Sequence, residues 1–390
     1  LYESFINPPK QARPRVWWHW MNGNITKEGI RKDLEWMHDA GIAGFHNFDA
    51  GLETPQAVKE RLIYMTPEWK DAFRYAMHLA DSLDLEVTIA SSPGWSETGG
   101  PWVKPENAMK KIVWRECEIQ GGSRVNMQLP EPYRNRGDFQ NESSGAPYDP
   151  VLDNIYGDIA VIAVRMPDGE LSSNDWDVSV KASDGADTEC FTDNDYNSGR
   201  IIGCDSEGKS WLMFSFKEPQ TIRSISLGRM GADRYRRSRI LEASDDGVNW
   251  TLLSDILPDA ITKQFSFNVR PTTARHFRYS STDGTCLECA EIRINASSRV
   301  EIDTEKAGFY ISGSVRDNYP TPPVDDAVPE DGIIDISRHC RDGKLNWNAP
   351  EGRWKILRFG WSLTGKGNAP AAPEATGGEV DNFERAADRD

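Results

Sequence analysis

Polar and aromatic side chains follow three successive apolar runs near the start of the chain, at the point where each run ends. These side chains are His19, Trp20 and Asn22 at the end of the first run, His46 and Asp49 at the end of the second, and Trp95 after the third. Aromatic rings stack on the flat faces of sugars, while imidazole, amide and carboxylate groups exchange hydrogen bonds with sugar hydroxyls. We therefore predict that these residues shape a carbohydrate pocket.

Carboxylates that could hydrolyse a glycoside are few in this set. Asp49 and Glu97 follow the early runs, and Glu379 and Asp381 follow a much later one. Glu379 and Asp381 are separated by one residue, so on a strand they share a face and could act jointly on a ligand or a cation. An inverting acid and base must be well separated. We therefore predict that Glu379 and Asp381 bind substrate, and we expect the catalytic acid and base beyond Asp390.

The elements that hold the early residues alternate between strands and helices. Arg15–Trp20, Ile42–Phe48 and Glu86–Ala90 are the apolar runs, while Thr26 and Thr66 are good helix N-caps. Repeated βα units predict a parallel sheet, either a (β/α)8 barrel or a doubly wound sheet. No Gly-x-Gly-x-x-Gly follows the first run, which disfavours a dinucleotide-binding domain.

After about residue 110 the pattern becomes all-β. Short runs rich in β-forming residues are separated by Gly, Asp, Asn and Pro, a spacing typical of a β-sandwich. These runs are Ile159–Val164, Trp211–Phe216, Thr221–Leu227, Arg239–Ala243, Gln264–Val269, His276–Tyr279 and Ala290–Ile294. Near Trp354–Trp361 a hydrophobic strand returns, followed by a loop rich in Gly, Pro and Ala. The predicted topology is a barrel that begins, is interrupted by β modules, and resumes.

Composition limits the partners of the protein. The formal net charge of −16 argues against nucleic acid and against docking on an anionic membrane, because both require clustered Lys and Arg. No apolar run of 18 residues is present, so no membrane insertion is expected. The sequence contains one cluster of arginines, which is interpreted either as a solvent-exposed strand face or as a binding site for an acidic sugar. Its members are Arg234, Arg236, Arg237 and Arg239.

The six cysteines include one Cys-x-x-Cys, formed by Cys286 and Cys289. A structural zinc site needs a second pair or well-spaced histidines, and the sequence has neither. Free thiols or one disulfide are therefore expected. No signal peptide is visible, and because the chain opens at Leu1 we expect a trimmed leader.

Three stretches together resemble the N-terminal region of glycoside hydrolase family 106, the α-L-rhamnosidases. They are Pro14–Thr26 running into Asp33–Met37, then Gly352–Gly360, and then Gly378–Asp381. The resemblance implies a large secreted or periplasmic bacterial enzyme with a (β/α)8 catalytic barrel. It implies inverting hydrolysis of terminal α-L-rhamnose in a glycan, with two glutamates and a calcium ion near the sugar.

Further expectations follow from this resemblance. The family's catalytic glutamates are expected on later barrel strands, so residues 1–390 alone should be inactive. Asn382 stands where the family pattern has a lysine, which puts the substrate contacts of this loop in question.

A second resemblance lies inside the interruption, to a discoidin-type (factor 5/8 C-type) jelly roll, the fold of many galactose-binding modules. It is carried by Phe191–Asp195, Trp211–Phe216, Glu242–Trp250, Ala274–Tyr279 and Ala290–Ile292. The resemblance implies a structural calcium ion, with the ligands Asp193, Asp195 and Glu291; the alternative is an acidic turn and a surface glutamate. Tyr196, Arg234 and Tyr235 are weaker candidates for sugar contacts.

The predicted class is therefore α/β plus all-β, with five segments. They are three βα units (1–110), a β-layer linker (111–174), the jelly roll (175–298), a β-layer return (299–350), and the fourth barrel strand with its loop (351–390). The leading hypothesis is a rhamnosidase-type glycoside hydrolase. The alternatives are a non-catalytic carbohydrate-binding protein that uses the jelly roll, and a scaffolding or adhesion module.

Overall fold

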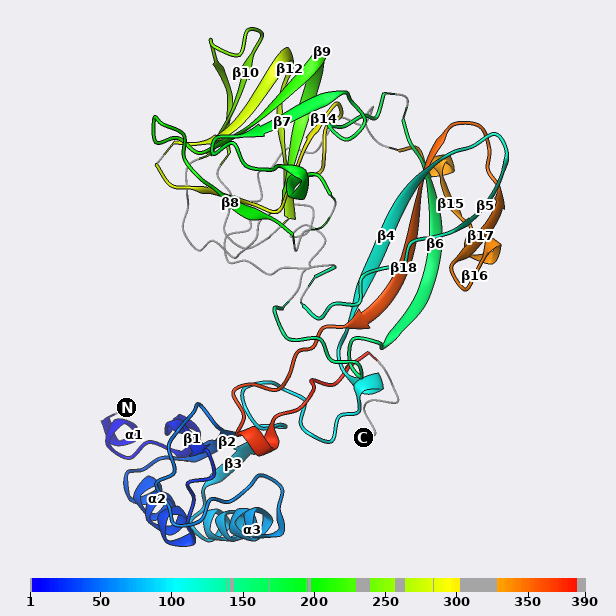
Figure 1. Ribbon diagram of the computed structural model, residues 1–390. Coiled ribbons are helices and arrows are strands. Elements are labelled where there is room, and N and C mark those ends of the chain that lie inside the picture. The colour runs from blue at the N-terminus through cyan, green and yellow to red at the C-terminus, as the bar shows by residue number, and fades with distance from the viewer. Residues whose placement is uncertain are drawn as a thin grey trace. The chain divides into compact units, whose positions relative to one another are not determined.

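The protein is described by a computed structural model that covers residues 2–137, 139–140, 144–167, 169–193, 195, 198–228, 239–256, 264–282, 284–301 and 328–383. Two compact units can be distinguished, and Figure 1 shows their elements. The first consists of Leu1–Lys111, Pro147–Ile155 and Leu363–Asp390, and the second of Ile112–Ala146 and Tyr156–Ser362. The chain thus leaves the first unit and returns to it, as the nested order predicted. In the described part of the chain, no helix is long and apolar enough to cross a membrane.

The first unit begins with alternating strands and helices. After the short helices α1 (Tyr2–Ile6) and η1 (Lys10–Ala12), the order is β1 (Arg15–Met21), α2 (Lys27–Asp39), β2 (Gly44–Ala50), α3 (Pro67–Ser82) and β3 (Glu86–Ile89). The three strands form one parallel sheet in the order β1-β2-β3, and α2 and α3 lie together against it (Figure 1). The predicted strands and helices in this region are confirmed.

Local chemistry explains these elements. Thr26 accepts a hydrogen bond from Gly29 N at the start of α2, and Thr66 accepts one from Trp69 N at the start of α3. Both caps satisfy amide groups that a first helical turn leaves free. Trp18 and Trp20 alternate with outward residues on β1 and bury their rings against the helices, in a core that includes Leu34 and Trp69. A strand residue and its second neighbour share a face, so this alternation sets which residues meet the helices.

The third predicted βα unit is incomplete in the described residues, since β3 is followed by loop residues 90–109 rather than an α-helix. This loop contains the short helix η2 (Pro105–Asn107), and the returning segment contains η7 (Pro373–Ala375). Isolated bridges join the two segments, Gly100 with Gly378 and Ala108 with Val380. The carboxyl end of the sheet is therefore built from residues far apart in the sequence.

The second unit contains a small β-layer made of two sheets. One has the strand order β15-β6-β18-β4 and the other β16-β17-β5. Trp347 and Trp354 meet edge to face between them, with ring centroids 5.4 Å apart, beside Leu345 and Ile356. The strands are β4 (Lys110–Gln120), β5 (Arg124–Gln128), β6 (Tyr156–Arg165), β15 (Ile333–Asp335), β16 (Cys340–Arg341), β17 (Lys344–Asn348) and β18 (Arg353–Leu363), with η5 (Glu330–Gly332) and η6 (Ser337–His339) between them.

The strand predicted as the fourth barrel strand is β18, and that prediction is wrong. β18 pairs antiparallel with β6 and lies next to β4, not next to β3. Buried and half-exposed residues alternate along it, as in an antiparallel strand with one covered face, whereas parallel barrel strands are buried on both faces. The resumed segment of the first unit is the loop that begins at Leu363.

The largest part of the second unit is an antiparallel β-sandwich. One sheet has the order β11-β10-β12-β9-β14, with β7 also paired to β9, and β8 and β13 form a second, two-stranded sheet. Its elements are β7 (Val178–Ala182), η3 (Glu189–Phe191), β8 (Arg200–Ile202), β9 (Trp211–Gly228), β10 (Arg239–Ser244), β11 (Thr251–Ile256), β12 (Gln264–Ser281), β13 (Leu287–Cys289) and β14 (Glu291–Asn295). The predicted pairs of runs 211–216 and 221–227, and 264–269 and 276–279, each lie within one long strand. The predicted all-β region is confirmed.

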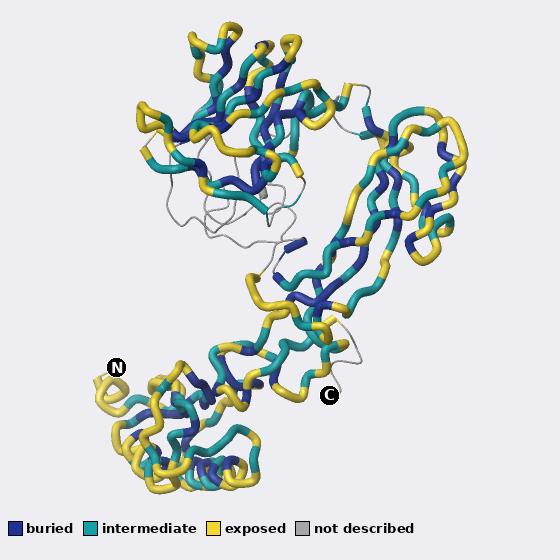
Figure 2. The backbone as a smooth tube through the Cα atoms, in the orientation of Figure 1, coloured by how far each residue is buried: buried dark blue, intermediate teal, exposed yellow. Residues whose placement is uncertain are grey.

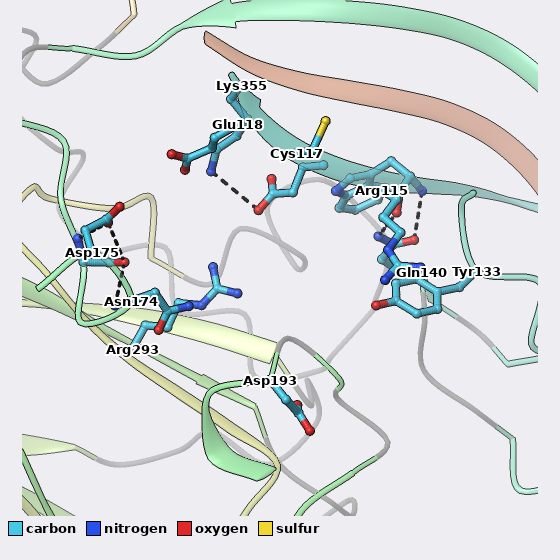
Figure 3. Close-up of a pocket in the computed structure, with 13 residues that line it drawn as sticks. Arg115, Cys117, Glu118, Tyr133, Gln140, Asn174, Asp175, Asp193, Arg293 and Lys355 are labelled. Carbon is cyan, nitrogen blue, oxygen red and sulfur yellow. Dashed lines mark hydrogen bonds and ion pairs between the residues drawn. The ribbon is translucent and has the colours of Figure 1, made fainter. Parts of the chain in front are cut away.

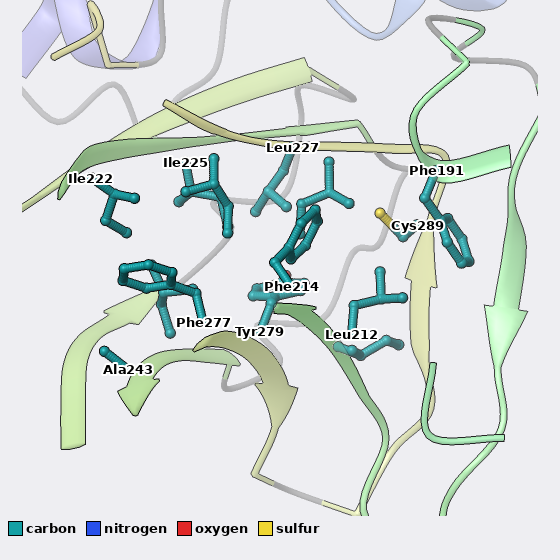
Figure 4. Close-up of a cluster of buried hydrophobic side chains, with 14 of the residues drawn as sticks. Phe191, Leu212, Phe214, Ile222, Ile225, Leu227, Ala243, Phe277, Tyr279 and Cys289 are labelled. Carbon is teal, nitrogen blue, oxygen red and sulfur yellow. The ribbon is translucent and has the colours of Figure 1, made fainter. Parts of the chain in front are cut away.

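Aromatic and aliphatic side chains fill the space between these two sheets (Figure 4). Phe214 and Phe277 come from the large sheet, while Ile202 and Leu287 come from the small one, and all four are almost wholly buried. Each such side chain stabilises the fold by about 1.5–3 kcal/mol relative to exposure. In Figure 2 the buried segments lie along the strands of the sandwich, and exposed ones lie at the turns.

Candidate functional site

Two histidines and two aromatic residues occupy the face of the β1-β2-β3 sheet that is turned away from the helices. His19 of β1 lies opposite Phe48 of β2, and Trp17 lies opposite His46. The ring centroids of His46 and Phe48 are 4.2 Å apart, and those of His19 and Phe48 are 5.6 Å apart. Both histidine Nε2 atoms are shielded from solvent, and neither has a hydrogen-bond partner among the residues described. The structure therefore brings His19 and His46 together on one face of the sheet.

Trp20, predicted to contact substrate, lies in the hydrophobic core. Its side chain is fully buried and packs edge to face with Trp69 and Phe73 of α3. Trp20 is on the helix-facing side of β1, two residues from Trp18 and one from His19. A ring without exposed surface cannot stack on a sugar, so its predicted role as a sugar contact is wrong for this arrangement.

Asp49 is also on the helix side of the sheet, and it is a buried carboxyl group. Its Oδ2 accepts a hydrogen bond from Trp69 Nε1 at 2.9 Å, and its residue is 5% exposed. Burial raises the pKa of Asp49 to about 7, against the lowering effects of the Trp69 hydrogen bond and the Arg61 charge. Asp49 therefore positions the ring of Trp69 rather than facing the same space as His19 and His46.

Asn22 belongs to a polar network at the carboxyl end of β1. Arg61 donates from Nε to Asn22 O at 2.7 Å and from Nη2 to Asn22 Oδ1 at 2.6 Å. The same guanidinium binds both carboxylate oxygens of Glu374 at 3.0 Å, and this hydrogen bonding lowers the pKa of Glu374. The backbone of Asn22 has a φ of 51°, a conformation that Asn tolerates better than most residues. The network ties residue 22 to a segment more than 300 residues later.

Asn368 organises the loops at the same end of the sheet. It is 1% exposed; its Nδ2 donates to the carbonyls of Pro93 and Ala375, both at 2.9 Å, and its Oδ1 accepts from Gly377 N at 2.7 Å. Gly94 has a φ of +87°, and a Cβ there would lie 2.8 Å from the carbonyl carbon of Ala369. The loop after β3 and the returning segment therefore pack backbone against backbone, which fixes the rim of the candidate site.

Glu379 and Asp381 lie on the returning segment, in different environments. The amide of Met109 donates to the Glu379 carbonyl at 2.9 Å, so its backbone is anchored to the loop before β4. The Asp381 carboxylate pairs with Lys110 Nζ at 2.9 Å, and both side chains are mostly buried. Asp381 is therefore engaged by a cation of its own chain. That Glu379 binds substrate stays a prediction.

Aromatic residues on the loops add a surface that the sequence predicted only in part. Trp95 is 53% exposed, as expected for a ring that contacts ligand, and Trp102 is 39% exposed. Trp102 stacks on Tyr64 with ring centroids 6.1 Å apart, and Tyr64 packs on Trp69 at 4.8 Å. Trp69 in turn donates to Asp49, so a continuous stack runs from the buried carboxyl group to the exposed Trp102. Tyr64, Trp102, Arg61, Glu374 and Asn368 were missed, although the Gly-Gly-Pro before Trp102 marked a loop.

The role of Asp193, Asp195 and Glu291 as calcium ligands stays a prediction, and the structure shows the surroundings of each. Ser198 Oγ lies 2.8 Å from Asp193 Oδ2, 2.9 Å from Asp195 O and 3.3 Å from Cys190 O. These are hard oxygen donors of the kind that calcium prefers. Glu291 is buried and lies beside Arg293, with Oε1 3.3 Å from Nε. Within the described residues, no three His, Cys, Asp or Glu side chains are grouped to hold a metal ion.

The basic cluster and the weaker sugar candidates lie mostly outside the described residues, namely Arg234, Arg236, Arg237, Tyr196 and Tyr235. Arg239 is described, and it is buried, with Nη1 donating to Ser281 Oγ at 3.2 Å. It therefore serves the interior of the sandwich rather than a solvated face.

A polar pocket of about 530 Å³ lies within the second unit (Figure 3). Strand β4 contributes Trp114 to Glu118, β18 contributes Lys355, and the sandwich contributes Asp193 and Arg293. Its polar groups are engaged with one another: Lys355 Nζ lies 3.5 Å from Glu116, and the Gln140 amide bonds the backbone of Trp114. None of the predicted sugar-site residues lines it.

Comparison with known proteins identifies relatives over nearly the whole chain. The family model described as alpha-L-rhamnosidase, glycoside hydrolase family 106, matches residues 6–390. The solved structure of a rhamnosidase from Novosphingobium sp. PP1Y superposes with a TM-score of 0.80 and 39% identity, covering 99% of this chain and 36% of that one. A putative beta-glucuronidase of Formosa agariphila is 36% identical over 177 residues, which are 45% of this chain and 14% of that protein. The chain thus spans well under half the length of both relatives.

Proposed function

Since this chain belongs to the alpha-L-rhamnosidase family, glycoside hydrolase family 106, we propose that the protein hydrolyses terminal α-L-rhamnosides of a glycan with inversion at the anomeric carbon. The family match over residues 6–390 carries this proposal. The histidines on one face of the parallel sheet support it, together with Trp95 and Trp102 on the loop after β3, because barrel enzymes act at the carboxyl ends of their strands. The match does not favour a non-catalytic carbohydrate-binding protein.

The proposal includes a (β/α)8 barrel that β1, β2 and β3 begin. In such a barrel the face turned away from the helices lines the interior. That face carries His19 and His46, whose Nε2 atoms have no partner in the described residues. We assign these two nitrogens to sugar hydroxyls, and the exposed rings of Trp95 and Trp102 to the face of a sugar ring.

Inverting hydrolysis requires a carboxylic acid that protonates the glycosidic oxygen and a carboxylate that activates water on the opposite side of the sugar. Three of the carboxylates near this end of the sheet are engaged elsewhere: Asp49 holds Trp69, Asp381 pairs with Lys110, and Glu374 pairs with Arg61. We therefore propose that residues 1–390 supply pocket walls, and that this stretch alone releases no sugar.

Calcium and location complete the proposal. Asp193, with the carbonyls of Cys190 and Asp195 and the hydroxyl of Ser198, would hold a calcium ion that fixes this loop of the sandwich, and Glu291 is proposed to complete the set. A second calcium ion near the sugar is implied by the family resemblance alone. We propose a periplasmic or secreted bacterial location, where glycan substrates are met.

A matched pair of histidine variants tests the site. In the native protein, meaning the full-length chain that includes residues 1–390 together with the proposed catalytic residues beyond them, His46→Ala should lower kcat/KM for an aryl α-L-rhamnoside about tenfold. This is the loss of one ligand hydrogen bond in a closed pocket. His38→Ala, on the last turn of α2 with its ring nitrogen 3.0 Å from Leu83 O, should leave kcat/KM unchanged. Equal activity of both variants and the wild type would contradict the assignment of His46.

The same assay should also test a β-glucuronide as substrate, because one relative is described as a putative beta-glucuronidase. An aryl β-glucuronide should be turned over at least a hundredfold more slowly than the rhamnoside. The reverse preference would replace the rhamnoside proposal with a uronide one, while leaving the hydrolase assignment intact.

A further inference from the structure

Two cysteines lie at the same end of the short β8-β13 ladder in the sandwich. The antiparallel register pairs Arg200 with Cys289 and Ile202 with Leu287. Continuing that register by one residue places Cys286 opposite Gly203, next to Cys204. The two cysteines are 82 positions apart in the sequence, and the ladder brings their backbones together.

Hydrogen bonds hold the backbone on both sides of this pair. The hydroxyl of Ser210, which is fully buried, donates to Ile202 O at 2.8 Å and accepts from Leu287 N at 2.9 Å. Gly203 N donates to Asp184 Oδ2 at 2.8 Å. Ile202 and Leu287 are themselves buried in the core. The segments that carry Cys204 and Cys286 are therefore positioned by the fold and not by the cysteines.

Neither cysteine is fully buried, and their side chains neighbour each other. Cys204 is exposed and Cys286 is half-buried. Partial desolvation, followed by the hydrogen bond with the Cys286 thiol, raises the pKa of Cys204. Cys289 differs, since its side chain is buried in the sandwich core, where Figure 4 shows it among Phe191 and Leu212. The Cys-x-x-Cys motif is thus divided between a half-buried thiol, Cys286, and a core thiol, Cys289.

We infer that Cys204 and Cys286 are the site of an intramolecular disulfide that closes the β8-β13 end of the sandwich. The oxidant is a disulfide of the surroundings, either a small molecule such as oxidised glutathione or an oxidoreductase. One cysteine thiolate attacks it and forms a mixed disulfide, releasing one thiol. The second cysteine thiolate then attacks the sulfur of the first cysteine in this mixed disulfide, and the external thiolate leaves and takes up a proton. Two protein thiols are oxidised and one external disulfide is reduced to two thiols.

The disulfide should stabilise the sandwich, because a long stretch of the chain lies between its two cysteines. Strands β9, β10, β11 and β12, which make up most of the large sheet, all fall between residues 204 and 286. In the chain-entropy model, closing so long a loop strongly lowers the conformational entropy of the unfolded chain and so stabilises the folded one. The midpoint temperature of thermal unfolding of the β-sandwich should therefore be roughly 5–15 °C higher in the oxidised protein than in the reduced one. The bond fits the proposed location outside the cytoplasm, but its formation in vitro does not depend on that location.

Peptide mapping of the intact chain tests the inference. The purified protein is equilibrated in a glutathione redox buffer, its free thiols are blocked with an alkylating agent, and its peptides are identified by mass spectrometry. A cross-linked peptide pair containing Cys204 and Cys286 is expected, with the loss of two hydrogen atoms. Cys204→Ser should abolish the cross-link and leave Cys286 alkylated, and Cys117→Ser should leave the cross-link unchanged.

Three outcomes would overturn the inference. They are full alkylation of Cys204 and Cys286 after oxidation, a glutathione adduct on Cys204 that Cys286 never displaces, and a cross-link between other cysteines. A cross-link formed without any rise in the unfolding temperature would confirm the site and refute its stabilising effect. Because Cys204 is exposed, Cys204→Ser should fold normally, and circular dichroism checks this.

Discussion

Asp49→Asn is expected to remove a pH dependence from the stability of the β1-β2-β3 unit. The carboxyl group of Asp49 is almost wholly buried, and burial raises its pKa from an ordinary value of 3.8 to about 7. A carboxyl group whose pKa is higher in the folded protein binds its proton more tightly there than in the unfolded chain. Its contribution to stability is therefore complete below pH 4 and is lost as the pH rises through 7.

The size of the effect follows from the two pKa values. A rise from 3.8 to about 7 corresponds to about 4 kcal/mol in total, of which about 3 kcal/mol falls between pH 5 and 8. Asparagine keeps an oxygen that can accept the bond from Trp69 Nε1, and it carries no titrating proton. The wild type should thus lose about 3 kcal/mol more than Asp49→Asn over that range.

Urea unfolding with pulse proteolysis measures this difference, when mass spectrometry follows peptides from residues 15–50. The matched control is Asp33→Asn, because Asp33 also accepts a bond from a tryptophan, Trp18 Nε1 at 2.9 Å, but is exposed. Asp33→Asn should keep the wild-type pH dependence. Parallel curves for the wild type and Asp49→Asn would refute the assignment of Asp49 as a buried carboxyl that is protonated below neutral pH.

Four shorter predictions concern other contacts. Glu374→Gln should weaken the first unit by about 1 kcal/mol, because the partner guanidinium of Arg61 is mostly buried but the carboxylate is 42% exposed; urea unfolding measures it. Phe277→Ala should destabilise the sandwich by about 3–5 kcal/mol in calorimetry or denaturant unfolding, and a smaller loss would contradict its place in the core. Calcium should raise the unfolding temperature of the sandwich, and Glu291→Gln should abolish that rise; no response of the wild type would argue against the ion. Trp102→Ala should raise KM about tenfold in the native protein with little change in kcat, and an unchanged KM would remove it from the sugar surface.

The sequence predicted the first strands and helices because their signals are local. Caps at Thr26 and Thr66 and apolar runs of strand length operate within a few residues, so they can be recognised without knowledge of distant contacts. Positions at strand ends also located His19 and His46. Trp20 was misassigned because nearness to the strand end was considered without the side-chain alternation, which places Trp18 and Trp20 on one face and Trp17 and His19 on the other.

Long-range pairing explains what the sequence could not supply. Arg61 and Glu374 are more than 300 residues apart, and nothing near either residue indicates their ion pair. The hydrophobic strand at 353–363 was expected beside β3 because it follows the interruption, yet its alternating burial suits an antiparallel sheet. Polarity in the sequence does not report that alternation, because Arg358 is buried whereas Leu357 and Phe359 are half-exposed.

The central claim is that this chain forms part of an inverting α-L-rhamnosidase. The most direct measurement is proton NMR of the purified native protein with an aryl α-L-rhamnoside, recording which anomer of the free sugar appears first. The account predicts release of rhamnose, with the β anomer formed first and the α anomer appearing only by mutarotation. First appearance of the α anomer would contradict inversion, and absence of any rhamnose release from a folded protein would contradict the proposed substrate.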